Sequence, residues 1–194
     1  MHGGYTMQNQ NNSSITNDEF ILKMESVINK TIPGLTMFVR DVNLSDDIAR
    51  KYTPDTIIRE KAFVDASHRV MGMITTHRFA ILSNHMVDLG KMENGTNWGL
   101  CVANRDSRFK VLTNYEYNGK TLILLLHLPD DEDWKMFINT KISIEDDIIE
   151  TSIERFKNKC NADIIPELAT KEWLDRCIFP IGLDDNGNYF ELED

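Results

Sequence analysis

The sequence is poor in the features that mark secreted and membrane proteins. It has three cysteines, Cys101, Cys160 and Cys177, and no Cys-x-x-Cys pair among its 194 residues. An odd number of widely spaced cysteines argues against a disulfide framework and favours reduced, buried thiols in a cytoplasm. No apolar run approaches the ~20 residues that span a bilayer, and the N-terminus lacks the basic-then-apolar pattern of a secretory signal. We therefore expect a cytoplasmic protein without a membrane partner.

The sequence also lacks the common motifs of cofactor and nucleic-acid binding. It has no glycine-rich phosphate cradle, no Gly-x-Ser-x-Gly elbow and no His-Glu-x-x-His pair. Its 21 basic and 31 acidic residues give a formal charge of −10, which disfavours a phosphate backbone as partner. Residues 182–193 have part of the spacing of a calcium loop, but Gly182 stands where the first acid is expected. We predict no cofactor, no metal site and no nucleic-acid partner.

The composition is that of one folded domain preceded by a tail. Apolar residues make up 41% of the chain and charged residues 27%, both ordinary values for a globular protein. Residues 1–17 are polar, rich in Asn and Gln and almost without apolar anchors, which predicts a disordered tail. Residues 18–194 contain no internal repeat and no linker-like stretch, so we expect a single α+β domain there.

The strongest local signal is a hairpin around Asn118-Gly119, the dipeptide that best fits a two-residue turn between strands. This turn pairs Tyr117 with Lys120 and predicts two faces. The first face is almost wholly apolar and carries Phe109, Val111, Thr113, Tyr115, Leu122, Leu124, Leu126 and Leu128. The second is mixed and carries Lys110, Leu112, Asn114, Glu116, Thr121, Ile123, Leu125 and His127. We expect the first face to be dry and the second to be half-exposed to solvent.

Helical and strand-like periodicity alternate in blocks along the chain. Helical spacing is found over residues 18–30, 45–52, 56–66, 130–137, 143–160 and 171–177. Strand-like spacing is found over 68–74, 78–84, 98–104 and the two arms of the hairpin. Helices, then strands joined by short loops, then helices favour a five-stranded antiparallel meander over about 68–128, packed by the N-terminal and C-terminal helices.

Histidines are the first candidates for chemistry. On a turn at Thr75-Thr76, His68 would lie opposite Ser83, with His85 one diagonal step away. Such a cluster could hold a metal or pair a nucleophile with a base, which makes His68, Ser83 and His85 the candidate catalytic residues. The simpler interpretation is that both histidines cap strand ends. A turn without Gly or Asn also leaves the register of residues 68–84 open.

Three further residues are candidates for ligand binding. Arg69 and Arg78 lie on the first predicted strands, where guanidinium groups could bind a carboxylate or phosphate, or pair with nearby acids instead. Trp98 ends the segment 90–98, whose glycines and polar side chains suit a recognition loop, although this tryptophan could equally anchor the core.

Two functions from different classes follow. The first is an acidic, non-enzymatic binding protein that engages a protein partner, favoured because no catalytic motif is complete. The second is a small-molecule- or metal-dependent enzyme that uses the His/Ser/Arg cluster on the sheet. The sequence does not decide between them, and it determines neither the identity of a partner or ligand nor the oligomeric state.

Overall fold

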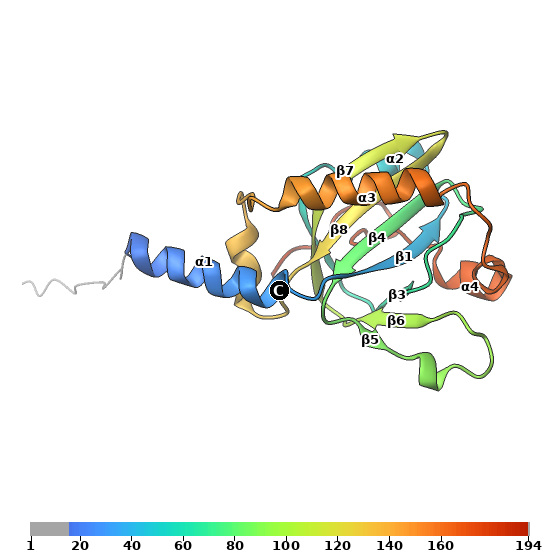
Figure 1. Cartoon of the computed structure of the whole chain (residues 1–194), viewed down its shortest axis with the longest axis horizontal. Coiled ribbons are helices and arrows are strands. Elements are labelled where there is room, and N and C mark those ends of the chain that lie inside the picture. The colour runs from blue at the N-terminus through green and yellow to red at the C-terminus, as the bar shows by residue number, and fades with distance from the viewer. Residues whose placement is uncertain (1–15, 194) are drawn as a thin grey trace, which may run out of the picture.

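A computed structural model of the chain describes residues 16–193 and shows one eight-stranded mixed sheet with helices packed on it (Figure 1). The strands are β1 Thr36–Val42, β2 Ile57–Glu60, β3 Val64–Ser67, β4 His77–Ser83, β5 Val87–Asp88, β6 Leu100–Ala103, β7 Ser107–Tyr117 and β8 Lys120–His127. The α-helices are α1 Asn17–Thr31, α2 Asp46–Ala49, α3 Glu145–Lys159 and α4 Lys171–Arg176. Short 3-10 helices are η1 Gly90–Met92, η2 Glu132–Phe137 and η3 Pro166–Ala169.

The predicted hairpin is confirmed as β7 and β8. Asn118 and Gly119 both have positive φ, 51° and 73°, as the favoured two-residue turn requires. Tyr117 pairs with Lys120, so the register beside the turn is the predicted one.

The five-stranded antiparallel meander is wrong, because the sheet has eight strands in the order β2-β7-β8-β4-β1-β3-β6-β5 and β4 runs parallel to β8. Residues 68–74 form no strand; Gly72 makes one isolated bridge to Ile164. The predicted helix over 56–66 is replaced by β2 and β3. Short apolar runs fit a helix face or a strand equally well, and here pairing with distant strands decided the outcome.

The two predicted faces of the hairpin are also wrong, because a bulge at Leu112 breaks the register between Val111 and Thr113. One extra residue in a strand moves the following side chains to the opposite face. Phe109 and Val111 therefore share a core with Ile123 and Leu125 instead of with the even-numbered leucines of β8. Both faces are covered over residues 109–112 and 122–127, whereas residues 113–121 beside the turn are partly or fully exposed.

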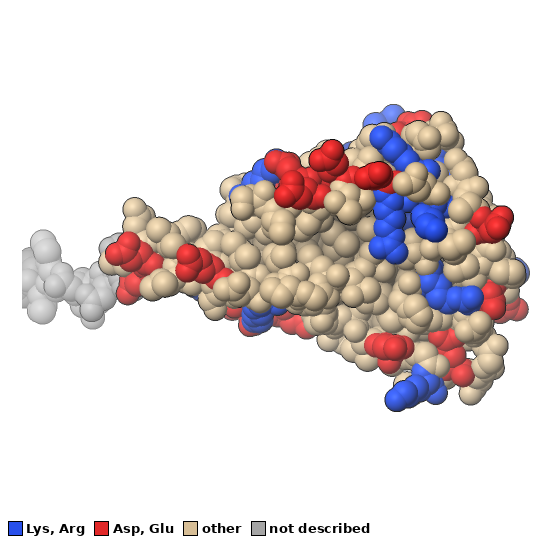
Figure 2. Space-filling view, in the orientation of Figure 1, with Lys and Arg blue, Asp and Glu red and all other residues tan. Residues whose placement is uncertain are grey.

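Helices and the C-terminal segment supply the cover. Phe156 of α3 packs with Trp134 and Phe137 of η2 in one core, while Ile181 and Leu183 complete the other. Figure 1 shows α3 lying across β7, β8 and β4, with the N-terminal part of α1 projecting from the body. In Figure 2 acidic side chains gather over the first half of α3 and basic ones towards its end, as expected for a helix dipole.

Helix α1 begins one residue before the range predicted from periodicity. Thr16 caps it, and Glu19 completes the capping box by accepting from the backbone N–H of Thr16. Most of the predicted tail over residues 1–17 lies outside the described residues. Within residues 16–193, no helix combines the length and apolar character that a membrane span requires.

The three cysteines are free and buried, as the sequence predicts. Burial raises the pKa of the Cys101 and Cys177 thiols to about 11. Because the thiolate is the reactive form, we expect no thiol of the native protein to react with Ellman's reagent within minutes at about pH 8. All should react once concentrated guanidinium chloride unfolds the chain. A native thiol that reacts as fast as free glutathione would contradict this prediction.

Candidate functional site

The parallel pairing of β4 with β8 brings the ends of two strands together. Leu82 pairs with Leu126, so Ser83 and His127 lie side by side where the strands end. The segments that leave these ends, residues 84–86 and 128–131, therefore start from the same edge of the sheet. Crevices outside the carboxyl ends of parallel strands are a common place for ligand sites.

His127 is buried, and one of its ring nitrogens lacks a partner. Its Nδ1 lies 2.8 Å from Ser83 Oγ, and its ring stacks on Phe109 with a centroid distance of 4.8 Å. Only 1% of the residue is exposed, and Nε2 has no hydrogen-bond partner among the described residues. Burial, and secondarily the charge of His85, lowers the pKa of His127 to about 3, so the ring is neutral at neutral pH.

His85 repeats this arrangement on the neighbouring segment. Its Nδ1 lies 2.8 Å from Asn84 Oδ1, and its Nε2 also lacks a partner among the described residues. The ring stacks on that of His127, with centroids 3.9 Å apart. Burial lowers the pKa of His85 as well, against smaller opposing effects of the Asp130 carboxylate and the Leu128 carbonyl. In each histidine, Nδ1 is hydrogen-bonded to a side-chain oxygen, and Nε2 has no hydrogen-bond partner among the described residues.

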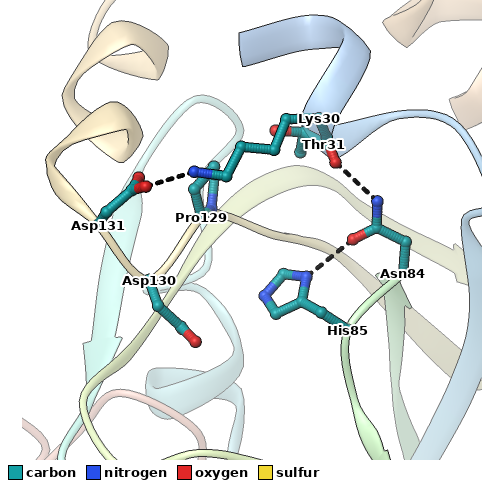
Figure 3. Close-up of a pocket in the computed structure, with 7 residues that line it drawn as sticks. All are labelled: Lys30, Thr31, Asn84, His85, Pro129, Asp130 and Asp131. Carbon is teal, nitrogen blue, oxygen red and sulfur yellow. Dashed lines mark hydrogen bonds and ion pairs between the residues drawn. The ribbon is translucent and has the colours of Figure 1, made fainter.

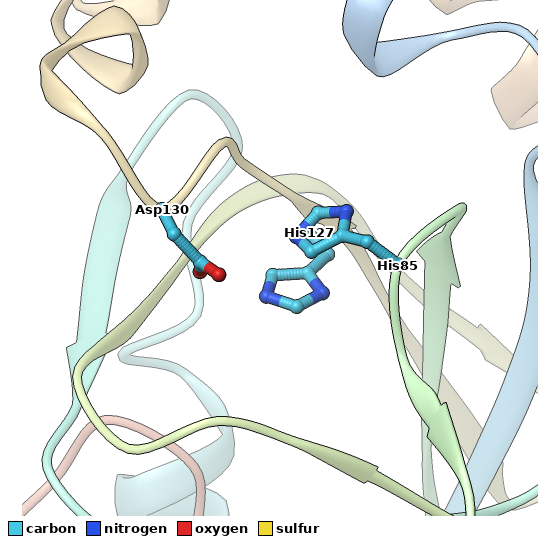
Figure 4. A group of neighbouring side chains, drawn as sticks. All are labelled: His85, His127 and Asp130. Carbon is cyan, nitrogen blue, oxygen red and sulfur yellow. The ribbon is translucent and has the colours of Figure 1, made fainter.

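Asp130 completes a cluster with the two histidines. One ligand atom from each of His85, His127 and Asp130 can be chosen so that all three lie within 4.8 Å of one another. In Figure 4 the carboxylate of Asp130 faces the stacked rings from the segment that follows β8. Ligand atoms around a tetrahedral zinc ion are about 3.4 Å apart, so a bound ion would draw the group closer. Asp130 is exposed and His85 is only half-buried, which leaves both side chains room to move.

A cavity of about 340 Å³ opens beside this cluster (Figure 3). Lys30 at the end of α1 lies on one side and pairs with Asp131. Asn84 donates to the Lys30 and Pro33 carbonyls, which fixes its side-chain oxygen towards His85. His85 and Asp130 line the same cavity, so two members of the cluster face solvent that a substrate could displace.

The candidate catalytic residues do not gather as predicted. His68 is exposed and lies elsewhere, in a cavity lined by Glu93 and Asn97, and its backbone N–H donates to the Gly99 carbonyl. Ser83 and His85 are neighbours, but Ser83 is fully buried and its Oγ is held by His127 and by the backbone N–H of His85. A hydroxyl in that position supports a histidine and does not face the cavity.

The candidate ligand-binding residues lie apart from this site. Arg78 is buried in a two-point ion pair with Asp41 and also donates to the Met71 carbonyl. Arg69 is half-buried and pairs with Glu167 at 3.4 Å. Trp98 is half-buried against Trp173, with ring centroids 5.5 Å apart.

Sequence reasoning missed His127 and Asp130. The sequence predicts a place on the mixed face of the hairpin for His127 and at a helix start for Asp130. The apolar residues before His127 and the acidic residues after Pro129 can be recognised in the sequence. The pairing of β8 with β4, which brings His85 close to them, cannot.

The sequence matches no known protein family, and no curated protein resembles it. Among solved structures it is similar to the type III effector XopAI from Xanthomonas axonopodis pv. citri, with 13% identity, coverage of 49% of this chain and 44% of that chain, and a TM-score of 0.43. The ADP-ribosyltransferase HopU1 of Pseudomonas syringae pv. tomato gives 21% identity, coverage of 48% and 45%, and a TM-score of 0.44. The chain spans less than half the length of either.

A third similar structure is Exoenzyme S from Pseudomonas aeruginosa, described in complex with human 14-3-3 protein beta and bound to carba-NAD. It shows 12% identity, coverage of 58% of this chain and 60% of that chain, and a TM-score of 0.41. Against such neighbours the prediction of a non-enzymatic binding protein is wrong, and the enzyme alternative fits better. Likeness at these TM-scores transfers neither ADP-ribosyl transfer nor its cofactor to this chain.

Proposed function

We propose that the chain is a metal-dependent hydrolase of small molecules, with a divalent ion held by His85, His127 and Asp130. The observation that carries this proposal is the Nε2 of His127, which has no hydrogen-bond partner within residues 16–193 although the residue is only 1% exposed. A buried polar atom without a partner is costly and calls for an explanation, and a metal ion would provide one. Neutral imidazole nitrogen is the commonest protein ligand for such ions.

The surroundings of the two rings support this proposal. Metal-binding histidines usually have their second ring nitrogen engaged by an oxygen that fixes the orientation of the ring. Ser83 and Asn84 stand in that position, each 2.8 Å from an Nδ1. Two imidazoles and a carboxylate suit zinc or ferrous iron, and three protein ligands leave a position for water.

The proposed ion beside this cavity would support hydrolysis. A divalent ion held by these residues would lower the pKa of a bound water molecule and so supply a nucleophile. The water oxygen would bond to a carbonyl or phosphoryl centre, the bond to the leaving group would break, and the proton lost by water would pass to that group. Lys30, whose pKa is raised by its hydrogen bond with Asp131, lines this cavity, where its ammonium group could bind negative charge on the substrate. Hydrolysis needs no co-substrate other than water.

Metal titration with matched carboxylate variants tests this proposal. Wild-type protein stripped with chelator should bind about one equivalent of Zn²⁺ or Co²⁺ by calorimetry, with a micromolar or tighter Kd, and Co²⁺ should give visible absorption bands. Asp130→Asn should weaken binding about 100-fold because it removes a ligand. Asp131→Asn, which changes the next residue in the same cavity, should stay within about threefold because an exposed ion pair contributes little.

Two outcomes would overturn the metal site: no binding at micromolar concentration, or equal affinities of the two variants. Hydrolysis of aryl ester and aryl phosphate substrates should be lost with chelator and restored with metal. If the metal binds but none of these substrates is hydrolysed, the proposed hydrolase activity is wrong and the proposed metal site still holds.

Other predictions from the sequence belong with this proposal. The buried, free thiols support the proposed cytoplasmic location. The charge of −10 supports a protein rather than a nucleic acid or an anionic membrane surface as any macromolecular partner. One domain over residues 18–194 remains a prediction.

A further inference from the structure

A second cavity, of about 400 Å³, lies between β1, the start of β3 and the C-terminal segment. No residue lines both this cavity and the one beside His85. Its lining combines Arg40 with three aromatic side chains, Phe63, Phe179 and Phe190. Phe63 and Phe179 are 59% and 60% exposed, which is unusual for residues of this size.

Arg40 is a buried cation without a carboxylate partner among the described residues. It is 6% exposed, and it donates from Nη1 to the Asp65 carbonyl and from Nη2 to the Phe179 carbonyl. A guanidinium group has five N–H donors, so three of them have no acceptor in the described part of the chain, including the N–H of Nε, which is buried. Buried charges are normally paired, because desolvation without a counter-charge is costly.

Two of the three acids that line this cavity, Glu60 and Asp184, already accept hydrogen bonds from backbone N–H groups. Both oxygens of Glu60 accept backbone N–H groups, one from Ala62 and one from Gly182, at 2.8 Å each. Asp184 accepts from the backbone N–H groups of Asn186 and Asn188 in its own turn. Arg176, at the same cavity, pairs with Asp65 at 2.7 Å. Among the described residues, Arg40 is therefore the buried charge of this cavity that has no carboxylate partner, while Asp184 is half-buried and Asp185 is exposed.

We propose that this cavity binds a small anion that carries a planar ring, with the anionic group on Arg40 and the ring against Phe179 and Phe63. The planar fork of arginine suits carboxylate and phosphate equally, so the shared chemistry is an oxyanion attached to an aromatic ring. Aromatic walls favour such a ring through stacking and apolar burial. The site is independent of the proposed metal centre.

Calorimetry of the full chain with two probes distinguishes the sources of the anion. Adenosine 5′-monophosphate represents ring-bearing phosphates, and indole-3-acetate represents ring-bearing carboxylates. At least one should bind with a Kd of about 100 µM or tighter, and uncharged adenosine or indole should bind at least about tenfold more weakly. Whichever probe binds identifies the preferred oxyanion.

Three variants assign the site. Arg40→Lys keeps the charge but loses the fork, and should weaken binding about tenfold. Phe179→Ala keeps the backbone carbonyl that Arg40 uses and removes an exposed ring, so it should fold normally and also bind about tenfold more weakly. Ile178→Ala is the matched control, since its side chain is 53% exposed and does not line the cavity. The proposal would be overturned if neither probe bound with a Kd below about 1 mM, or if the uncharged rings bound as tightly as the charged probes. It would also be overturned by wild-type affinity in Phe179→Ala or in a folded Arg40→Lys.

Discussion

Replacing Glu145 with Gln is expected to lower the free energy of unfolding by about 4 kcal/mol, because it removes the buried counter-charge of a buried ammonium. Lys110 is fully buried and its Nζ lies 2.8 and 2.9 Å from the two oxygens of Glu145, which is itself 2% exposed. The remaining acceptors are the Thr140 carbonyl at 2.6 Å and the carboxylate of Asp55, whose side chain is 64% exposed. Urea denaturation measures the loss, and the midpoint of thermal unfolding should fall by about 10 °C.

The double variant Lys110→Met with Glu145→Leu separates the contribution of the ion pair to stability from that of side-chain packing. Apolar groups of similar size can replace a buried ion pair at little cost, so the double variant should recover most of the stability lost in either single variant. A double variant as unstable as the sum of the two singles would show that no coupling exists. Single variants that each cost less than about 1 kcal/mol would show that the pair is not buried in solution.

Gly72→Ala is expected to lower the free energy of unfolding by about 3 kcal/mol, because the added methyl group would clash with a backbone carbonyl. A Cβ atom at Gly72 would lie 1.9 Å from the Ala162 carbonyl oxygen and 2.8 Å from its carbon. The Gly72 N–H donates to the Asp163 carbonyl at 3.0 Å, so this contact joins the segment before β4 to the chain after α3. A methyl group would have to separate the two segments.

Gly90→Ala is the matched control for that substitution. Gly90 also has an ordinary φ, and its nearest atom to an added Cβ is an oxygen of the Asp88 side chain at 3.1 Å, which can move. It should cost less than about 1 kcal/mol. Equal losses in the two variants, measured by urea denaturation, would mean that Gly72 does not pack against Ala162 in solution.

Local signals in the sequence predicted several elements correctly. The Asn118-Gly119 turn requires positive φ at two positions, and few other dipeptides accept it, so the hairpin and its Tyr117–Lys120 pair followed directly. Helix α3 followed from an apolar stripe with an acidic start. These features depend on residues close together in the chain, where spacing alone fixes the geometry.

Other features required contacts that spacing does not encode. The run over 56–66 fits a helix face, yet Ile57–Glu60 pairs with β7 and Val64–Ser67 pairs with β1 and β6. The bulge at Leu112 left the turn intact and still moved Phe109 and Val111 to the other face. Lys110 was expected on a half-open face for the same reason, whereas the structure pairs it with Glu145 inside the protein.

The sequence by itself determined that this is an acidic α+β protein with a strong hairpin, free buried thiols and two histidines near strand ends. Only the tertiary structure decided that β8 lies parallel to β4, which brings His85 to His127 and Asp130. His85 and His127 come together because β4 pairs with β8. This pairing depends on burial of both faces of the sheet and on closure of the long loop between the two strands. The free energy of this pairing is the sum of many weak contacts between residues far apart in the sequence, so no short motif predicts it.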